Sequence, residues 1–338
     1  MLKDLTSLEL WASQYFKTKA INLLPLPHDA SLRRYYRITQ NNKNFIVADS
    51  SYDLNVYKKF IDVNLVFKKF SLRVPEIFAC NNKEGFLILT DFGDQTYFAA
   101  TNKNNFASNY QNAIKQIILL QKEYLSESAN QLILSHLDAT FLAWELERFA
   151  KYFLQMQLNI QFSDAEKIVL QNCFKILVSS ASLQPQIIIH RDYHSKNLMV
   201  LNNNEVGILD FQDAMLGPLT YDLASLLRDC YVHVARDDAL QLVKYYYENR
   251  KNNFAKSDKL TLSKLIKYFD FMSIQRDLKA IYTFSYKFLE HHDQRYQPYI
   301  KTAFNYIIET SALYSEFFAF KELIQQKVLP VFLRGNFL

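Results

Sequence analysis

The chain has 338 residues, of which 49% are hydrophobic and 22% are charged, and its formal net charge is +5 at pH 7. The length is too great for one compact core of ordinary size, so two lobes are expected, and the apolar fraction is large enough to fill them. The small positive charge is spread along the chain rather than gathered on one face or tail, which does not indicate a protein that binds nucleic acid.

The cysteines and the apolar runs indicate the cellular compartment in which the protein is expected. Cys80, Cys173 and Cys230 are odd in number and far apart, and they form no CxxC pair, so neither a disulfide framework nor a structural zinc site is indicated. The first residues lack the uninterrupted apolar core of a signal peptide. No run approaches the roughly 18 apolar residues of a membrane span. We predict a cytoplasmic protein that binds neither nucleic acid nor a membrane.

The first ninety residues predict a small sheet crossed by helices. Helices are expected at 4–19 and 52–70, because apolar residues recur there every three or four positions. Runs rich in β-formers and bounded by turn residues predict strands at 32–39, 44–49, 74–80 and 85–92.

From about residue 105 long helical patterns dominate, in keeping with a chain that has only 5 glycines. Helices are predicted at 106–124, 138–157 and 163–181, the last capped by Ser163 or Asp164. Short strands are predicted at 186–190 and 205–211, with a further apolar run at 197–201, and helices are predicted from there to the end. A hinge near residues 91–95 predicts two touching lobes, 1–92 and 93–338.

Residues 190–197, HRDYHSKN, place several charged and titratable side chains directly after an apolar strand. Asp192 precedes Asn197 by five residues, and Asp210 follows thirteen residues later in GILDFQD. An aspartate can accept a hydroxyl proton and aim the oxygen at a γ-phosphate, while amide and carboxylate oxygens are hard ligands for Mg²⁺. This spacing therefore predicts phosphoryl transfer, which depends on positioning and charge neutralisation.

The same stretch has two alternative interpretations. His190 and His194 are four residues apart and suggest a zinc pair, but the HExxH pattern needs Glu at the position of Arg191, and the preceding run reads as a strand. A solvated turn in which an aspartate merely caps a loop is the second alternative. The joint spacing of the three oxygen-bearing residues favours phosphoryl transfer over both.

The motifs resemble those of a known superfamily. HRDxxxxN (190–197) followed by DFQ (210–212) resembles the kinase catalytic loop and metal motif, and GPLTYDLASLLRD (217–229) replaces the activation segment of protein kinases. Together they look like the superfamily of aminoglycoside phosphotransferases and choline kinases. SLRRYYRI (31–38) and LTDFGDQTYF (89–98) are similar to one branch, the bacterial anomeric kinases for N-acetylmuramate and N-acetylglucosamine of cell-wall recycling.

The resemblance implies an α+β, two-lobed protein-kinase-like fold, with a small N-terminal β-sheet lobe that binds nucleotide and a larger, mainly helical C-terminal lobe. It also implies a small-molecule kinase that uses ATP and Mg²⁺. Asp192 would be the catalytic base, and Asn197 and Asp210 would be the metal ligands.

Further roles are carried over from the same resemblance. The hinge backbone would contact the adenine, at Leu89, Thr90 and Asp91. The catalytic loop would be supported structurally by His190, His194 and Asp222. Arg191 would either hold a neighbouring acid or touch the substrate, and the structural role is favoured.

The sequence also departs from the protein-kinase pattern. It has no glycine-rich loop and no strand lysine, since Ala48 and Asp49 stand where that lysine is expected, and the helix at 52–70 contains no glutamate to pair with one. Arg33 and Arg34 are our candidates for the cations that meet the phosphates, because guanidinium binds phosphate through two hydrogen bonds. The alternative is that they alternate with a tyrosine on a strand and face water.

The favoured function is phosphorylation of a sugar, at the anomeric hydroxyl of N-acetylmuramate or N-acetylglucosamine. Phosphorylation of an aminoglycoside, choline or homoserine is the alternative within the superfamily, and lysine-rich helices near the C-terminus disfavour a cationic acceptor. A non-catalytic kinase-like binding module is the alternative outside it. The missing strand lysine supports that module, and retention of all three oxygen-bearing residues opposes it. The sequence leaves the oligomeric state open.

Overall fold

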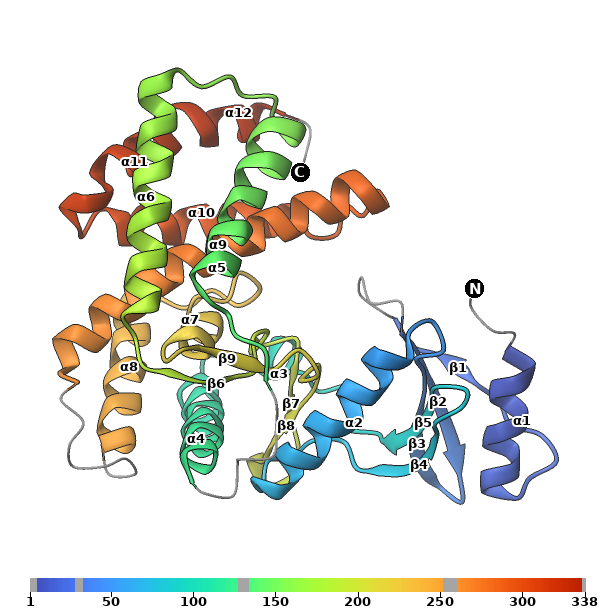
Figure 1. The fold of residues 1–338 in the computed structure, drawn as a ribbon. Coiled ribbons are helices and arrows are strands. Elements are labelled where there is room, and N and C mark those ends of the chain that lie inside the picture. Colours follow the sequence, from blue (N-terminus) through green and yellow to red (C-terminus); the bar gives the residue numbers. More distant parts are fainter. Residues whose placement is uncertain (1–4, 28–32, 127–133, 252–259, 336–338) are drawn as a thin grey trace. The chain divides into compact units, whose positions relative to one another are not determined.

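The structure is a computed structural model that describes residues 5–27, 33–126, 134–251 and 260–335 (Figure 1). Its helices and strands confirm the predicted α+β class, with a small N-terminal antiparallel sheet and a mainly helical remainder. Within these described stretches, no helix is both long and apolar enough to cross a membrane. All three cysteines are free.

The chain forms two compact units, and each is described by itself. The first unit comprises Met1–Ala100 and Asn197–Asp213, and the second comprises Thr101–Lys196 and Ala214–Leu338. The chain therefore passes from the second unit back into the first directly after the catalytic loop. The sequence predicts a lobe boundary at residue 92, but it does not predict that the chain returns to the first unit.

A five-stranded antiparallel sheet forms the centre of the first unit, in the order β1-β2-β3-β5-β4. Its strands are β1 (Leu24–Pro25), β2 (Arg34–Gln40), β3 (Lys43–Asp49), β4 (Ile77–Asn81) and β5 (Phe86–Thr90). Strands β2 and β3 join through a tight turn at Asn41 and Asn42, which both have positive φ. Asparagine tolerates this left-handed backbone better than most residues, so the polar run between the strands forms the predicted turn.

Helices cover both faces of this sheet (Figure 1). They are α1 (Leu5–Phe16) and α2 (Leu54–Lys69), and the short α3 (Tyr97–Ala100) follows the sheet. Leu8 and Ala12 of α1 pack into an apolar cluster with Val47 and Ile88 of the sheet. Helix α2 begins at Asp53, whose side chain accepts a hydrogen bond from the N–H of Asn55, as expected of a helix N-cap.

The hairpin after the catalytic loop packs on the N-terminal part of the chain. It consists of β7 (Leu198–Val200), the 3₁₀ turn η3 (Asn202–Asn204) and β8 (Val206–Ile208). The N–H of Ile208 donates to the carbonyl of Arg73 at 2.8 Å. Gly207 lets the Phe92 ring approach closely, since a Cβ at that position would lie 2.9 Å from the ring.

The second unit is mainly helical. Its helices are α4 (Phe106–Leu125), α5 (Ala139–Arg148), the π-helical η2 (Phe149–Gln157), α6 (Asp164–Ser182), α7 (Tyr221–Leu227), α8 (Arg236–Lys251), α9 (Leu262–His291), α10 (Gln297–Ser311), the 3₁₀ turn η4 (Ser315–Phe317), α11 (Phe318–Leu323), the π-helical η5 (Ile324–Val328) and α12 (Leu329–Arg334). Ser163 caps α6, and Glu166 completes a capping box, so the predicted helix start is confirmed.

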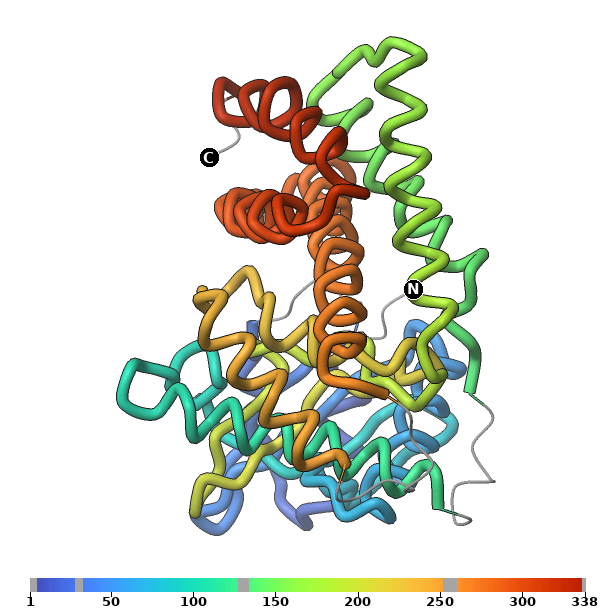
Figure 2. Tube along the Cα trace, turned by 90° about the vertical axis from the view of Figure 1, so that its left-hand side faces the viewer, coloured from blue at the N-terminus to red at the C-terminus, as the bar shows by residue number. Residues whose placement is uncertain are grey.

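Helix α9 runs through the middle of this unit and contacts α5, η2, α6, α7, α8 and α10 (Figure 2). A two-stranded antiparallel sheet, β6 (Gln186–Ile189) with β9 (Met215–Pro218), lies beside the helices. Gly217 of β9 accommodates the side chain of Ile189, because a Cβ there would lie 2.5 Å from the Ile189 Cδ1 atom. The sequence did not predict β9.

Candidate active site

Asp222 holds the start of the catalytic loop, which follows β6. Its buried carboxylate accepts hydrogen bonds from the N–H groups of His190 at 2.6 Å and Arg191 at 3.0 Å. Arg191 has φ +81°, a backbone conformation that non-glycine residues rarely adopt. Such a conformation persists only where the surroundings hold it, and the two bonds to Asp222 do so. This is the arrangement expected of a brace.

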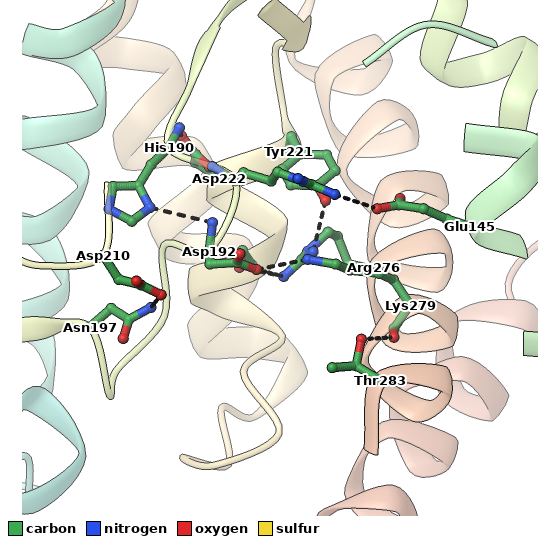
Figure 3. Close-up of polar contacts among 12 residues, drawn as sticks. Glu145, His190, Asp192, Asn197, Asp210, Tyr221, Asp222, Arg276, Lys279 and Thr283 are labelled. Carbon is green, nitrogen blue, oxygen red and sulfur yellow. Dashed lines mark hydrogen bonds and ion pairs between the residues drawn. The ribbon is translucent and has the colours of Figure 1, made fainter. Parts of the chain in front are cut away.

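The His190 ring also supports the loop. It is fully buried, and its Nδ1 atom accepts a hydrogen bond from the N–H of Asp192 at 3.3 Å (Figure 3). It packs edge-on against Tyr193, whose hydroxyl donates to the carbonyl of Ala113 in α4 at 2.9 Å. These contacts fix the backbone of Asp192 relative to α4.

The end of the loop is held by a second buried carboxylate, Asp229. It accepts hydrogen bonds from the N–H groups of Ser195 and Tyr231, each at 2.8 Å. Burial raises the pKa of Asp229 to about 6. Burial also lowers the pKa of His194 to about 3, so that ring is neutral where it packs against Tyr231. Among the described residues no group of three or more histidine, cysteine and acidic side chains is placed to hold a metal ion, which gives the zinc alternative no support.

The carboxylate of Asp192 pairs with two cations of α9 (Figure 3). Lys279 Nζ lies 2.7 Å from Asp192 Oδ1, and Arg276 Nη2 lies 3.6 Å from the same oxygen. Burial alone would raise the pKa of Asp192, but Lys279 and Arg276 outweigh it and hold that pKa well below its usual range. Arg276 is itself fixed by a 2.8 Å hydrogen bond to the Tyr221 hydroxyl. Asp192 is therefore ionised.

A buried glutamate of α5 extends this network. Glu145 accepts hydrogen bonds from Arg191 at 3.3 Å and from Gln275 of α9 at 2.8 Å. Arg191 thus holds a neighbouring acid, as the favoured prediction had it. Sequence reasoning missed four members of the network: Glu145, Gln275, Arg276 and Lys279. One signal was available, since the run QRDLK (275–279) places polar residues in an otherwise apolar stretch of helix.

The candidate metal ligands lie in the first unit, at the two ends of the β7–β8 hairpin. Asn197 Nδ2 lies 3.4 Å from Asp210 Oδ2, so the structure brings these two side chains together. Gln212 donates to the other carboxylate oxygen of Asp210 at 2.8 Å. Asp210 has φ +59°, a left-handed conformation that is uncommon outside glycine. An asparagine and an aspartate side by side supply the oxygen ligands that suit Mg²⁺, which proteins bind through one or two such groups together with substrate phosphates.

Both candidate phosphate-binding arginines are engaged. Arg33 is only 1% exposed, donates to Ser50 Oγ at 2.8 Å and lies over the Phe60 ring. Arg33 therefore does not face water, so the alternative that both arginines are solvent-exposed strand residues is wrong for Arg33. Arg34 pairs with Asp49 on the neighbouring strand, at the position where a kinase lysine was expected. A phosphate contact by either arginine stays a prediction.

The hinge residues end β5. Leu89 is buried, and Thr90 Oγ1 accepts a hydrogen bond from the N–H of Glu76 at 3.1 Å. The Asp91 carboxylate pairs with Arg37 at 2.5 Å and accepts the N–H of Gly93 at 2.8 Å. These contacts hold the side chains, and an adenine contact by the backbone stays a prediction.

The fold and the motif residues together define a class of protein. A small antiparallel sheet, a helical second unit, an ionised loop aspartate and an Asn–Asp pair of metal-ligand type are the parts of a phosphoryl-transfer enzyme. Residues 22–256 match the model of the phosphotransferase enzyme family, so the chain belongs to that family. It is a phosphotransferase with an alcohol group as acceptor, and the predicted enzyme class is confirmed.

Two relatives share one name, N-acetylmuramate/N-acetylglucosamine kinase. The protein of Pseudomonas putida (strain KT2440) is 32% identical over 231 residues, which are 68% of this chain and 65% of that protein. The match thus spans slightly less than two thirds of that relative. The protein of Neisseria meningitidis serogroup B (strain MC58) is 26% identical over 314 residues, 91% of each chain.

Solved structures share the fold. Choline kinase LicA from Streptococcus pneumoniae has a TM-score of 0.62 at 13% identity, over 91% of this chain and 99% of that one. ADP-bound aminoglycoside phosphotransferase APH(2'')-Ib has a TM-score of 0.58 at 14% identity, over 89% and 96%. The predicted resemblance to the aminoglycoside phosphotransferase and choline kinase superfamily is confirmed, and at this identity the structures speak for the fold alone.

Proposed function

We propose that this protein uses ATP and Mg²⁺ to transfer the γ-phosphate to the anomeric hydroxyl of an N-acetylated amino sugar, N-acetylmuramate or N-acetylglucosamine. The names of the two relatives support the sugar. The observation that carries the proposal is the pairing of the Asp192 carboxylate with Lys279 at 2.7 Å.

That pairing bears on which hydroxyl reacts. A carboxylate whose pKa is held low is a weak base, and general-base catalysis is most effective when the base is matched to the acid it deprotonates. An anomeric hydroxyl is more acidic than an ordinary alcohol. Asp192 therefore needs only to orient that oxygen and accept its proton late in the transfer.

The charges around Asp192 do not by themselves distinguish the class of acceptor. Lys279 and Arg276 pair with Asp192, and Arg191 pairs with Glu145. Asp222 and Asp277 also act on Arg276, so the cations near the base are matched by nearby carboxylates. The support for an amino-sugar acceptor over a cationic one therefore comes from the names of the relatives.

The other side chains have supporting roles in the proposal. Asn197 and Asp210 would hold Mg²⁺, which neutralises phosphate charge when it is bound. Asp222 and Asp229 keep the loop backbone fixed at its two ends, so that Asp192 presents its carboxylate in one position. A positioned base contributes through geometry as well as proton transfer.

The test is phosphorus NMR of the product formed from ATP, Mg²⁺ and each of the two sugars. A sugar 1-phosphate signal coupled to the anomeric proton is expected. The methyl glycosides of the same sugars, whose anomeric oxygen is blocked, serve as matched controls and should give no product. Phosphorylation of the methyl glycosides would show that another hydroxyl reacts.

The role of the base is tested by Asp192→Asn. This substitution keeps the shape and removes the proton acceptor, and it should lower kcat by about 10²–10⁴-fold. Unchanged turnover would remove Asp192 from the mechanism. If no sugar, aminoglycoside or choline stimulated ADP release by the intact chain, the binding-module alternative would replace the enzyme.

A further inference from the structure

A guanidinium in the second unit lies among four aromatic rings. The Arg148 Cζ atom is 4.4 Å from the ring centre of Trp144 and 4.7 Å from that of Tyr152, both on the same helical segment. It is 5.4 Å from the rings of Tyr282 and Tyr286 on α9. Each distance is within the range of a cation–π interaction.

Arg148 differs from the other cations near the catalytic loop. Lys279 and Arg276 pair with Asp192, and Arg191 pairs with Glu145. Across the described stretches of the chain, no carboxylate forms an ion pair with Arg148. Its buried Nε atom makes no hydrogen bond, which is also true of Arg191 and Arg276, so the missing counter-charge is what sets Arg148 apart. A partly buried guanidinium without a counter-charge is costly, and aromatic rings offset only part of that cost.

This arginine lies along the same α5–α9 seam as the Asp192 network. Glu145, which holds Arg191, is three residues before Arg148 on α5. Tyr282 is three residues after Lys279 on α9, so each pair shares one face of its helix. Arg148 and Tyr282 are therefore each about one helical turn beyond a residue of the ion-pair network that holds the base. Its edge is open, since Trp144 is 44% exposed.

The two sugars of the proposed function differ in one group. N-Acetylmuramate carries a lactyl ether with a carboxylate, several bonds from the anomeric carbon, and N-acetylglucosamine carries a hydroxyl instead. A planar guanidinium binds a carboxylate through two parallel hydrogen bonds, and aromatic rings offer apolar faces to a sugar ring. An acceptor whose anomeric oxygen is at Asp192 would extend its far side along this seam.

We propose that Arg148 and the surrounding aromatic rings form the subsite for the lactyl carboxylate of N-acetylmuramate, and that this subsite sets the preference for the acidic over the neutral sugar. The inference rests on the proposed function, because it assigns a further contact to the same acceptor. The competing explanation is that Arg148 only packs α5 and η2 against α9.

The test compares kcat/KM for the two sugars in the intact chain and in Arg148→Met, which keeps the length of the side chain and removes its charge. A hydrogen-bonded ion pair is typically worth about 1.5–3 kcal/mol, or about 10–150-fold. We expect kcat/KM for N-acetylmuramate to fall at least tenfold more than that for N-acetylglucosamine, mainly through KM. Arg148→Lys keeps the positive charge but loses the two parallel hydrogen bonds of the guanidinium. Its kcat/KM for N-acetylmuramate should lie between those of the intact chain and of Arg148→Met.

Lys151→Met is the matched control, since it removes an exposed cation next to Tyr152 on the same helical segment. It should not change the ratio between the two sugars. Thermal unfolding of each variant separates packing from recognition. An equal fall for both sugars, or no fall for either, would overturn the subsite. If Arg148→Met does not fold, Arg148→Lys decides by the same ratio.

Calorimetric binding of N-acetylmuramate without ATP separates the two proposals. Arg148-dependent binding without turnover would uphold the subsite and overturn the proposed function. If both sugars are phosphorylated and the ratio of their kcat/KM values does not change on substitution of Arg148, the proposed function would stand and the subsite would be overturned. A chain that neither binds nor phosphorylates N-acetylmuramate would overturn both.

Discussion

At the scale of single residues, the ion pair between Asp192 and Lys279 sets the chemistry of the candidate base. Lys279 is 8% exposed, while the side chain of Asp192 is 32% exposed, so solvent screens the pair in part. Arg276 at 3.6 Å, His194 on the loop itself and Tyr221 of α7 also act on Asp192. With Lys279 and Arg276 in place, Asp192 stays ionised through the mildly acidic range.

Replacing Lys279 with methionine tests this. Lys279→Met removes the nearest cation and leaves the burial, so the pKa of Asp192 should rise. A base must be ionised to work, so activity should then fall as the pH drops through the range of the raised pKa. We expect the acid limb of the kcat/KM profile to move up by about 1 pH unit or more, roughly the effect of one charge at this distance.

The matched control is Lys267→Met, on the same helix, where the lysine is half exposed and pairs with Glu316 at 2.8 Å. An exposed pair of this kind contributes little, and the acid limb should stay where it is. An acid limb that stays unchanged in Lys279→Met as well would show that this lysine does not act on the base.

At the scale of elements, helices carry most of the second unit, and one short strand sets where the catalytic loop begins. Strand β6 ends at Ile189, directly before the loop, and it pairs only with β9 among the described strands. Gly217 lies opposite Ile187 in this pair, and the side chain of Ile189 occupies the space that a Cβ on Gly217 would need. The start of the loop therefore depends on this close packing.

Gly217→Ala should strain this pairing, because the new Cβ would lie 2.5 Å from the Ile189 Cδ1 atom. Overpacking of this kind typically costs about 1–3 kcal/mol in the free energy of unfolding. Ile189→Val removes the clashing methyl group and by itself should cost about 0.5–1.5 kcal/mol. Chemical denaturation of both single variants and the double variant measures the coupling. A double variant as unstable as the sum of the two would contradict this account.

At the scale of the whole molecule, the candidate base and the candidate metal ligands belong to different compact units. Asp192 is in the second, and Asn197 and Asp210 are in the first, together with the N-terminal sheet. The hairpin that presents Asn197 and Asp210 is anchored on the first unit at Arg73 and Gln95. The nucleotide-binding and metal-binding residues predicted from the sequence thus share one unit.

This arrangement predicts that Mg²⁺·ATP stabilises the protein. A ligand at 100 times its Kd raises the free energy of unfolding by about 2.7 kcal/mol. Asp210→Asn should lose the part of this stabilisation that depends on Mg²⁺, because the metal then lacks its carboxylate ligand. Thermal unfolding with ATP, with and without Mg²⁺, measures that part. Asp213→Asn, half exposed and paired with Lys59 at 3.0 Å, is the matched control and should keep it.

A wild-type shift that is the same in Mg²⁺ and in a chelator would argue against a metal at Asp210. The same holds for an Asp210→Asn variant that keeps the full Mg²⁺-dependent shift. Loss of stability without nucleotide in that variant is a separate effect, and it is read from the unliganded unfolding curve.

The helices and most strands were predictable because their signals are local. Periodic apolar residues predicted the long helices, Ser163 predicted the start of α6, and the run between β2 and β3 predicted their turn. Strand β9 was missed because its four residues, MLGP, include a glycine and a proline, and its partner β6 is more than twenty residues earlier in the chain. Pairing at that separation leaves no local pattern.

The sequence by itself determined the family, the two-part α+β fold and the residues Asp192, Asn197 and Asp210 as candidates, because short motifs keep their spacing within a few residues of one loop or hairpin. Only the tertiary structure decided which charges surround Asp192. Lys279 and Arg276 are more than eighty residues away in the chain, and Glu145 is more than forty residues before the loop. Helix packing brings these residues together, and their spacing along the chain does not predict that contact.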